Sequence, residues 1–411
     1  MAKVNPFRPG KPVSPGMFAG RLVELDAIDN ALVQAKYDNS QHFLVTGERA
    51  IGKSSLLFVA EAVATGAVST LGGERLHFLT VPLTVKRNET QTTVARRIMD
   101  KVKRQTDSML AKAKLMKIAD FVTRLEVAGT RLHPAEQIAA ATDVADNLVE
   151  ALCTTVTAIA PEHDGVCILI DEADSAGAEV GALLKTVVDG LARAGCGKVV
   201  VGVAGLPDIL DKIRSGHESG TRLFQVLPLE PLEDDERKDV VRKGLAEARD
   251  KTGVETTIAD DALDLIAHLS DGYPHFIQQY AHDAFDADSD QHITVDDVLE
   301  GAFRENGAIA QLGQAIFNTQ VFRDIRTPSY RSVLGAMAPS GDSYVTKAKI
   351  REITGLQGAT LTNALSAMSK KHIILRHPEK RGEYRLPTQT FALWLRAVLP
   401  KLAKANGMGD K

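Results

Sequence analysis

The residues from Gly47 to Ser54 follow the pattern G-x-x-x-x-G-K-S, which is typical of loops that hold phosphate groups. Its two glycines let backbone amides turn toward a phosphate, and the N-terminus of a following helix adds positive potential. The Lys53 ammonium would reach the β- and γ-phosphates of a nucleotide, and the Ser54 hydroxyl would bind Mg²⁺. An apolar run at 42–46 precedes the pattern and an apolar helical pattern at 55–64 follows it. This strand–loop–helix context favours a phosphate site over a chance glycine-rich turn.

A second apolar run, at 166–170, ends in Asp171 and Glu172. In a parallel sheet this run would bring both carboxylates to the same edge as the glycine-rich loop. Asp171 would bind Mg²⁺, directly or through water, and Glu172 would orient and deprotonate an attacking water. An exposed acidic pair at a helix start is the alternative interpretation. The nucleotide contacts that we expect from the loop are Gly47, Glu48, Arg49, Ala50, Ile51, Gly52, Lys53, Ser54 and Ser55.

The order of apolar segments predicts how these residues are positioned. Nearly continuous apolar runs at 42–46, 76–82, 166–170, 198–204 and 224–229 alternate with helical patterns. This alternation predicts an α/β domain with a mainly parallel sheet. We expect an N-terminal arm at 1–20, a core at 21–231 with a helical insertion at about 85–160, an all-helical lid at 232–327 and a further domain at 328–411. Within these, we expect helices at Ser108–Glu126 and at Val295–Asp324, the second bending near Gly307.

Several motifs resemble those of a known family. They are Asn5-Pro6-Phe7, then Pro15, then Phe18-Ala19-Gly20-Arg21, followed by TGERAIGKSSL, ILIDEAD, VAGLPDIL and SDGYPHFIQQY. With them, essentially the whole chain resembles AAA+ ATPases related to archaeal origin-recognition proteins, and Gly272-Tyr273-Pro274 resembles the Gly-x-Pro element of STAND ATPases. The resemblance implies an AAA+ P-loop fold that binds ATP and Mg²⁺ between the core and the lid.

The resemblance also assigns roles to residues outside the loop. Phe18 and Arg21 would line the adenine pocket, Pro274 would pack near the base, and Arg222 would act as an arginine finger on a neighbouring subunit. The alternatives are a proline-rich tether, a helix cap followed by a proline-initiated helix, and an ordinary surface arginine. Three departures from the family pattern bear on hydrolysis, namely His275 in place of a lid cation, an apolar Ala204-Gly205 strand end, and Ala50 where many relatives have glycine.

The C-terminal quarter differs from the rest of the chain in charge. Residues 321–411 contain 16 Lys and Arg and 6 Asp and Glu, a net charge of +10, although the whole chain of 411 residues has a net charge of −4. We interpret 328–399 as a winged helix-turn-helix with helices at 330–338, 346–353 and 360–371 and a hairpin of 373–376 with 383–386. We expect Val333, Leu334, Met337, Ile350, Ile353, Leu361, Leu365 and Met368 to face inward.

The third helix and the hairpin are the predicted nucleic-acid surface, and their outward residues are short and polar or basic. We expect contacts with double-stranded DNA from Thr362, Asn363, Lys370, Lys371, Arg376, Lys380 and Arg381, with Ser366 also facing outward. The alternative is a winged helix that packs intramolecularly or binds protein.

The hypothesis from sequence is an AAA+ ATPase that couples nucleotide state and homo-oligomer assembly to DNA binding. The alternative is a STAND-like signalling scaffold with slow turnover. With 44% hydrophobic and 25% charged residues the chain can form cores, which excludes wholesale disorder. Three scattered cysteines favour a reducing compartment, and no signal peptide or membrane span is recognised, so we expect a cytoplasmic protein.

Overall fold

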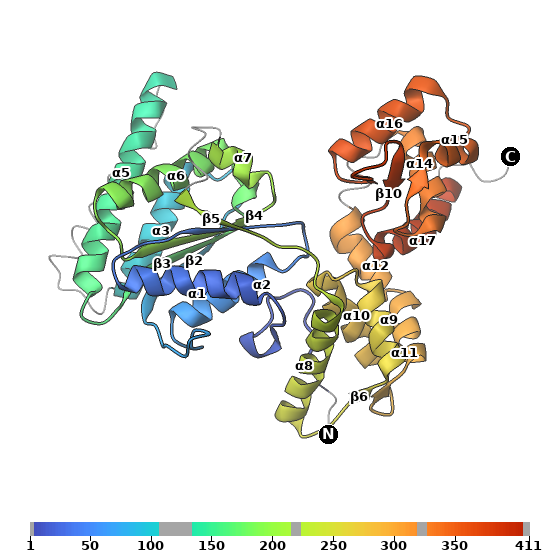
Figure 1. Ribbon diagram of the computed structural model, residues 1–411, viewed down its shortest axis with the longest axis horizontal. Coiled ribbons are helices and arrows are strands. Elements are labelled where there is room, and N and C mark those ends of the chain that lie inside the picture. Colours follow the sequence, from blue (N-terminus) through green and yellow to red (C-terminus); the bar gives the residue numbers. More distant parts are fainter. Residues whose placement is uncertain (1–3, 107–133, 215–222, 319–326, 406–411) are drawn as a thin grey trace. The chain divides into compact units, whose positions relative to one another are not determined.

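A computed structural model describes residues 4–106, 134–214, 223–318 and 327–405. The chain divides into two compact units (Figure 1). One, the sheet unit, comprises residues 12–230, and the other, the helical unit, comprises residues 1–11 and 231–411. The chain therefore passes between the units at residues 11–12 and again at residues 230–231, and the predicted N-terminal arm is divided between them.

The sheet unit contains five parallel strands in the order β2-β3-β4-β1-β5. The strands are β1 (Phe43–Thr46), β2 (Phe78–Thr84), β3 (Gly165–Asp171), β4 (Val199–Gly205) and β5 (Gln225–Pro228). The helices are η1 (Pro15–Met17), α1 (Leu22–Lys36), α2 (Lys53–Ala64), α3 (Gln91–Thr106), α5 (Pro134–Ile159), η2 (Ala173–Ser175), α6 (Ala178–Arg193) and α7 (Ile209–Arg214). In Figure 1, α1 and α2 lie on one face of the sheet and α3, α5 and α6 on the other.

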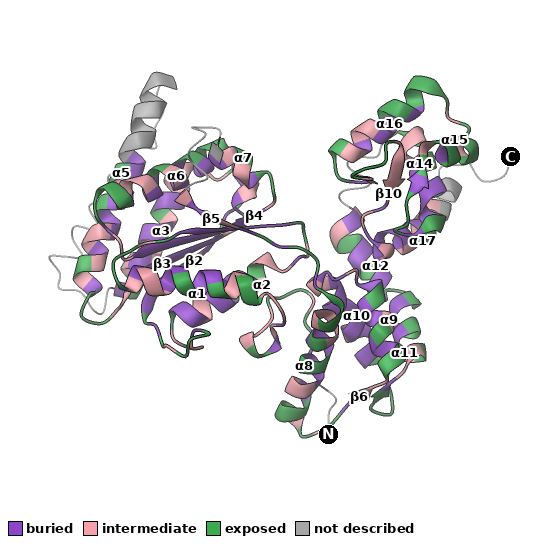
Figure 2. Cartoon of the chain, viewed as in Figure 1, coloured by how far each residue is buried: buried purple, intermediate pink, exposed green. Residues whose placement is uncertain are grey.

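Burial explains why the strands could be recognised in the sequence. All four residues of β1 and all seven of β4 are buried, so both of their faces are apolar (Figure 2). The five predicted strands are confirmed, with ends that differ by at most two residues. The predicted helix Ser108–Glu126 lies outside the described residues.

The helical unit begins with helices around two short strands. These elements are α8 (Asp234–Thr252), β6 (Thr257–Ile258), α9 (Asp260–Leu269), α10 (Pro274–Ala287), β7 (His292–Ile293), α11 (Val295–Phe303), α12 (Ala308–Leu312) and the π-helical turn η4 (Gly313–Phe317). The prediction of one bent helix over 295–324 was wrong, because α11 stops at Phe303 and α12 starts afresh. Asn306 has φ 61°, a left-handed conformation that interrupts helical hydrogen bonding, and Gly307 is the N-cap of α12.

The C-terminal elements follow the order expected of a winged helix-turn-helix. They are α14 (Pro328–Met337), η5 (Ala338–Ser340), β8 (Val345–Thr346), α15 (Lys347–Thr354), α16 (Gly358–Lys370), β9 (Leu375–Arg376), β10 (Glu383–Arg385) and α17 (Gln389–Ala405). Strands β8, β10 and β9 form an antiparallel sheet in that order. The predicted inward residues are buried except Ile353, which is 53% exposed because α15 ends at Thr354 and buries only Ile350. Ser366, expected to face outward, is half-buried.

The two halves of the helical unit share an apolar core. Phe317 packs edge-on against Phe276, with ring centroids 6.0 Å apart, and against Phe391 and Trp394 of α17. The buried Tyr280 hydroxyl lies 3.0 Å from the Thr390 hydroxyl. The start of α17 is thereby fixed to α10. Among the described residues, the structure contains no helix with the length and apolar character needed to cross a membrane.

Candidate functional site

The glycine-rich loop connects the end of β1 to the start of α2 at the carboxyl edge of the sheet. Gly52 has φ 101° and is the N-cap of α2, so the first turn of that helix directs its backbone N–H groups toward the loop. A Cβ on Gly47 would lie 2.9 Å from Ile51 Cγ2 and 3.1 Å from the Leu229 carbonyl oxygen, so only glycine fits there. Ala50 has φ 68°, which explains why glycine suits this position. The backbone therefore has the concave form that cradles phosphate oxygens.

Two side chains of α2 carry the polar chemistry of this loop. Lys53 Nζ donates to the carbonyl oxygens of Gly47 and Glu48 at 2.7 and 2.6 Å. Ser54 Oγ donates to Asp171 Oδ2 at 2.5 Å, which joins the helix to the end of β3. Burial lowers the pKa of Lys53, and the nearby carboxylates of Asp174 and Asp171 act in the opposite direction. The structure therefore brings together the lysine, the hydroxyl and the first carboxylate that the sequence pattern predicted.

Glu172 follows Asp171 in a left-handed conformation, with φ 53°. Its backbone N–H donates to Asp171 Oδ1 at 2.8 Å, and its side chain is exposed. A non-glycine residue in this conformation is uncommon, and here it turns the chain sharply after the strand. The turn leaves one carboxylate facing the Ser54 hydroxyl and the next one accessible to solvent.

Asp174, which the sequence patterns do not single out, connects the ends of β3 and β4. Its Oδ1 accepts a hydrogen bond of 2.9 Å from the Leu206 N–H, just beyond β4. A Cβ on Gly205 would lie 3.1 Å from the same oxygen, so the glycine lets the two strand ends approach. The Lys212 ammonium donates to the carbonyl oxygens of Asp174 and Ala176. Asp174, which follows β3, therefore places a carboxylate beside the end of β4. The last two residues of β4, Ala204 and Gly205, have no polar side chain of their own.

The N-terminal segment of the sheet unit lies against the loop. The Val13 N–H donates to Ser55 Oγ at 3.4 Å. The Ser55 hydroxyl therefore binds the backbone of the N-terminal segment. Arg21 has φ 62° and donates to the carbonyl oxygens of Ile51, at 3.4 Å, and of Glu230. Phe18 is half-buried. Arg21 thus ties the loop backbone to the last residue of the unit.

Two predicted residues, Pro274 and His275, belong to the helical unit. Pro274 is the first residue of α10 in the helical unit, after Gly272 with φ 77°. A left-handed glycine followed by a helix that begins at proline explains this local geometry without a contact to a nucleotide. His275 is largely buried, which lowers its pKa. Arg222 lies outside the described residues.

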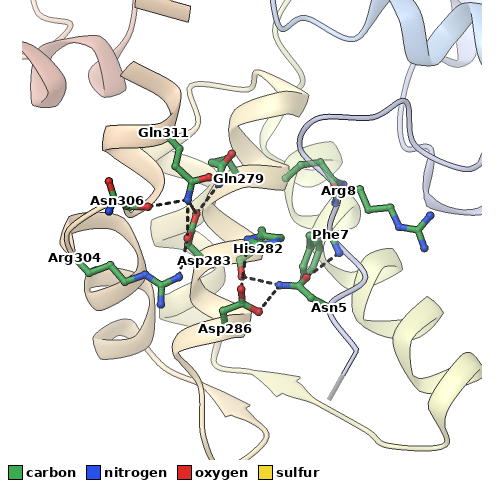
Figure 3. A network of polar contacts seen from close by, with 11 residues as sticks. Asn5, Phe7, Arg8, Gln279, His282, Asp283, Asp286, Arg304, Asn306 and Gln311 are labelled. Atoms are coloured by element: carbon green, nitrogen blue, oxygen red, sulfur yellow. Dashed lines mark hydrogen bonds and ion pairs between the residues drawn. The ribbon is translucent and has the colours of Figure 1, made fainter. Parts of the chain in front are cut away.

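Residues 5–8 lie on α10 of the helical unit (Figure 3). Asn5 Nδ2 donates to the His282 carbonyl oxygen at 2.9 Å and to Asp286 Oδ1 at 2.7 Å. The buried Phe7 ring packs edge-on against Phe285, with centroids 6.3 Å apart. The Arg8 N–H donates to Gln278 Oε1 at 3.0 Å. These contacts fix the beginning of the chain to one helix.

The C-terminal surface presents the predicted polar and basic residues. The exposed set on α16, the residue after it and the hairpin is Thr362, Asn363, Lys370, Lys371, Arg376, Lys380 and Arg381. Lys347 Nζ, at the start of α15, donates to Thr362 Oγ1 of α16 at 2.8 Å. This contact adds a cation to the surface that the sequence did not predict, because Lys347 lies in the preceding helix. His377 Nδ1 accepts from the backbone N–H groups of Glu379 and Lys380, at 3.1 and 3.0 Å, and so orders the turn of the hairpin.

The fold and the loop define a P-loop nucleotide-binding class of protein. Residues 17–201 match the family described as AAA ATPase domain. The Aeropyrum pernix ORC2 protein, in ADPNP–ADP complexes, is similar with a TM-score of 0.59 and 15% identity, over 94% of this chain and 95% of that one. The ADP form of that protein gives a TM-score of 0.50 with 14% identity, over 98% of both chains.

Cdc6p from Pyrobaculum aerophilum gives a TM-score of 0.47 with 14% identity, over 98% of both chains. No curated protein sequence matches the chain significantly. At identities this low, likeness to solved structures shows the fold alone. The fold is that of the origin-recognition-type AAA+ ATPases, as the sequence motifs implied.

Proposed function

We propose that the chain binds ATP with Mg²⁺ and hydrolyses it. The 2.5 Å contact between Ser54 Oγ and Asp171 Oδ2 carries this proposal. A hydroxyl and a carboxylate at that distance, at the mouth of a phosphate-binding loop, are the oxygen ligands that Mg²⁺ takes alongside nucleotide phosphates. Lys53 supplies positive charge for the β- and γ-phosphates. The ADPNP–ADP complexes of the ORC2 protein of similar fold support a nucleotide at this place.

In this proposal Glu172 is the base that orients and deprotonates water, and the test changes only that group. The variant Glu172→Gln keeps the size of the side chain, so ATP affinity stays within about threefold while turnover falls at least about 100-fold. Glu179→Gln on α6, another exposed glutamate of the sheet unit, is the matched control. Unchanged turnover in Glu172→Gln would remove this residue from the reaction, and no nucleotide binding by the native chain would remove the whole proposal.

We further propose that nucleotide state and self-association govern binding of double-stranded DNA through the C-terminal winged helix. The exposed cations Lys370, Lys371, Arg376, Lys380 and Arg381 support a phosphate-binding surface. Arg222, supplied by a neighbouring copy, would stabilise charge on the γ-phosphate. The small number of cysteines fits a protein that acts in the cytoplasm.

The DNA proposal is tested by reversing charge on the hairpin. The double variant Lys380→Glu/Arg381→Glu should weaken duplex binding at least tenfold and reduce the slope of log Kd against log salt by about 2. The control Arg249→Glu/Lys251→Glu makes the same charge change on α8 of the same unit. Equal effects of the two double variants would indicate a response to net charge alone and contradict a defined surface.

Assembly is tested by measuring molar mass by light scattering with ADP and with ATP in the Glu172→Gln background. We expect a larger species with ATP. An inactive Arg222→Ala chain mixed with a Glu172→Gln chain should regain turnover, because an intact base and an intact arginine can then meet at one interface. A strict monomer in every nucleotide state would remove Arg222 from its role in trans.

One observation favours a different candidate, a signalling scaffold with slow turnover. The Gln389 N–H at the start of α17 donates to Asp271 Oδ2 at 2.7 Å, and Phe391 and Trp394 pack on Phe317. The C-terminal elements are therefore held by the helical part of their own unit, as an intramolecular module would be. For this candidate we expect duplex binding to be absent and tight ADP binding to persist without measurable turnover.

A further inference from the structure

A cavity of about 650 Å³ in the sheet unit adjoins the candidate phosphate site. Ser54, Asp171 and Glu172 belong to its lining, and so do four cations from the turn after β2 and from α3. The four cations are Lys86, Arg87, Arg97 and Lys101. None of these four has a place in the function proposed above.

The turn after β2 is built so that two of its cations stay unpaired. Glu89 accepts the Lys86 N–H at 2.7 Å and both of its carboxylate oxygens accept from Arg97 at 2.6 Å. Asn88 has φ 61°, which closes the turn. The one carboxylate of the turn is thus engaged by a backbone group and by Arg97, and the side chains of Lys86 and Arg87 project into solvent.

The third uncompensated cation comes from α3. The Lys101 ammonium donates to the carbonyl oxygen of Pro82, a neutral group. Over the described ranges of the chain, the structure places no carboxylate in an ion pair with Lys86, Arg87 or Lys101. Arg97 is neutralised by Glu89. The cavity therefore holds three cations outside any ion pair of the described residues, and its lining also includes the carboxylates of Glu61, Asp171 and Glu172.

Strand register places these cations close to the carboxylates of the candidate site. Thr84 of β2 pairs with Asp171 of β3, and the Val85 N–H donates to the Asp171 carbonyl oxygen at 2.9 Å. Lys86 and Arg87 follow two and three residues after Thr84. An anion near Asp171 and Glu172 is repelled by those carboxylates and attracted by the cations of the same cavity.

We propose that this cavity is a second phosphate-group site, separate from the glycine-rich loop, which takes the inorganic phosphate that leaves after hydrolysis. The inference rests on the proposed ATPase function for the source of its ligand. The lining cations hold the phosphate dianion electrostatically, while Asp171 and Glu172 discourage its return. The same chemistry suits a backbone phosphate of nucleic acid, and the experiment separates the two sources.

The direct test is equilibrium dialysis of radiolabelled inorganic phosphate against the full chain loaded with ADP and Mg²⁺. Removing two cations by Lys86→Gln/Arg87→Gln should raise the Kd for phosphate about tenfold. The matched control Arg96→Gln/Arg104→Gln removes two exposed cations of α3 that do not line the cavity, and its Kd should stay within twofold. Lys101→Gln changes a cation on α3 and should also weaken phosphate binding. This second variant shows whether the loss of affinity comes from lost charge rather than from a disturbed turn.

Phosphate affinity unchanged in both Lys86→Gln/Arg87→Gln and Lys101→Gln overturns the proposal, as does no phosphate binding by the native chain at millimolar concentration. Because dialysis does not require turnover, weaker phosphate binding in the variants of a chain that hydrolyses no ATP would support the site and reject the ATPase function. A DNA duplex that displaces phosphate, and binds more weakly to Lys86→Gln/Arg87→Gln, would identify nucleic acid as the source of the phosphate group. A duplex without effect would leave inorganic phosphate as that source.

Discussion

Asp174 joins the ends of two neighbouring strands, and its removal should have two separable effects. In Asp174→Ala the Leu206 N–H loses the carboxylate oxygen that it contacts at 2.9 Å. The same change removes the carboxylate that, among charged neighbours, most raises the pKa of Lys53 against the lowering effect of burial. The first effect concerns stability and the second concerns nucleotide affinity.

The stability effect follows from the hydrogen bond. A bond from a backbone N–H to a charged acceptor contributes about 1.5–3 kcal/mol, and Leu206 is half-buried, so we expect a loss of about 2 kcal/mol in Asp174→Ala. For a domain of this size that loss lowers Tm by about 6 °C. Asp174→Asn keeps an acceptor oxygen at the same position and loses only the charge, so its Tm should fall by about 3 °C.

The affinity effect follows from the charge and is the same in both variants. One unit charge a few ångströms from Lys53 contributes on the order of 1 kcal/mol, so ADP should bind about fivefold more tightly to Asp174→Ala and to Asp174→Asn. Thermal unfolding and ADP titration calorimetry measure the two effects. The control Asp208→Ala removes an exposed carboxylate near the start of α7 and should change neither quantity appreciably.

Two results would refute this reasoning. If Asp174→Asn loses as much stability as Asp174→Ala, the hydrogen bond to Leu206 is not the cause. If neither variant changes ADP affinity, Asp174 does not act on Lys53 and is a structural residue alone.

Three further predictions concern single contacts. Ala50→Gly relieves a left-handed alanine at φ 68°, which should raise Tm by about 1–2 °C because the relief slightly exceeds the entropy cost of glycine. Gly244→Ala places a Cβ 2.3 Å from the Phe7 ring, so the helical unit should lose about 2 kcal/mol and residues 1–11 should become sensitive to protease. Burial raises the pKa of Asp271 to about 7, although the Gln389 N–H opposes this, so the folded state binds more protons than the unfolded state between pH 4 and 7 and stability falls as pH rises. Asp271→Asn should therefore be more stable than the native chain at pH 8, by on the order of 4 kcal/mol, and equal to it at pH 4 in urea unfolding.

The sequence predicted the strands and the central pair of the site for physical reasons. Strands covered on both faces are continuous apolar runs, and β3 and β4 are of this kind. The Ser54–Asp171 contact followed from two motifs that each end at the same edge of a parallel sheet. Both inferences required only that the strands lie parallel in one sheet.

What the sequence could not predict depends on contacts between segments without a motif. Asp174 meets Leu206 only because β3 and β4 are neighbours, and the strand order is not written in either segment. Ile353 has the spacing of an inward residue, yet α15 ends one residue later and leaves it exposed. The break after α11 depends on a left-handed Asn306, a conformation that asparagine adopts only in some contexts. In each case tertiary structure decided between local alternatives.

The residues around the glycine-rich loop also suggest how a nucleotide could influence the helical unit. The chain leaves the sheet unit at residues 11–12 and 230–231, and both places are next to residues bonded to the loop or to the helix that follows it. Val13 donates to Ser55, while Arg21 bridges the carbonyl oxygens of Ile51 and Glu230. A rearrangement of the loop that moves the Ile51 carbonyl therefore acts on Arg21, and through it on the residue that precedes the helical unit. The proposed coupling of nucleotide state to the C-terminal surface would require such a physical connection, and these hydrogen bonds would be its first step.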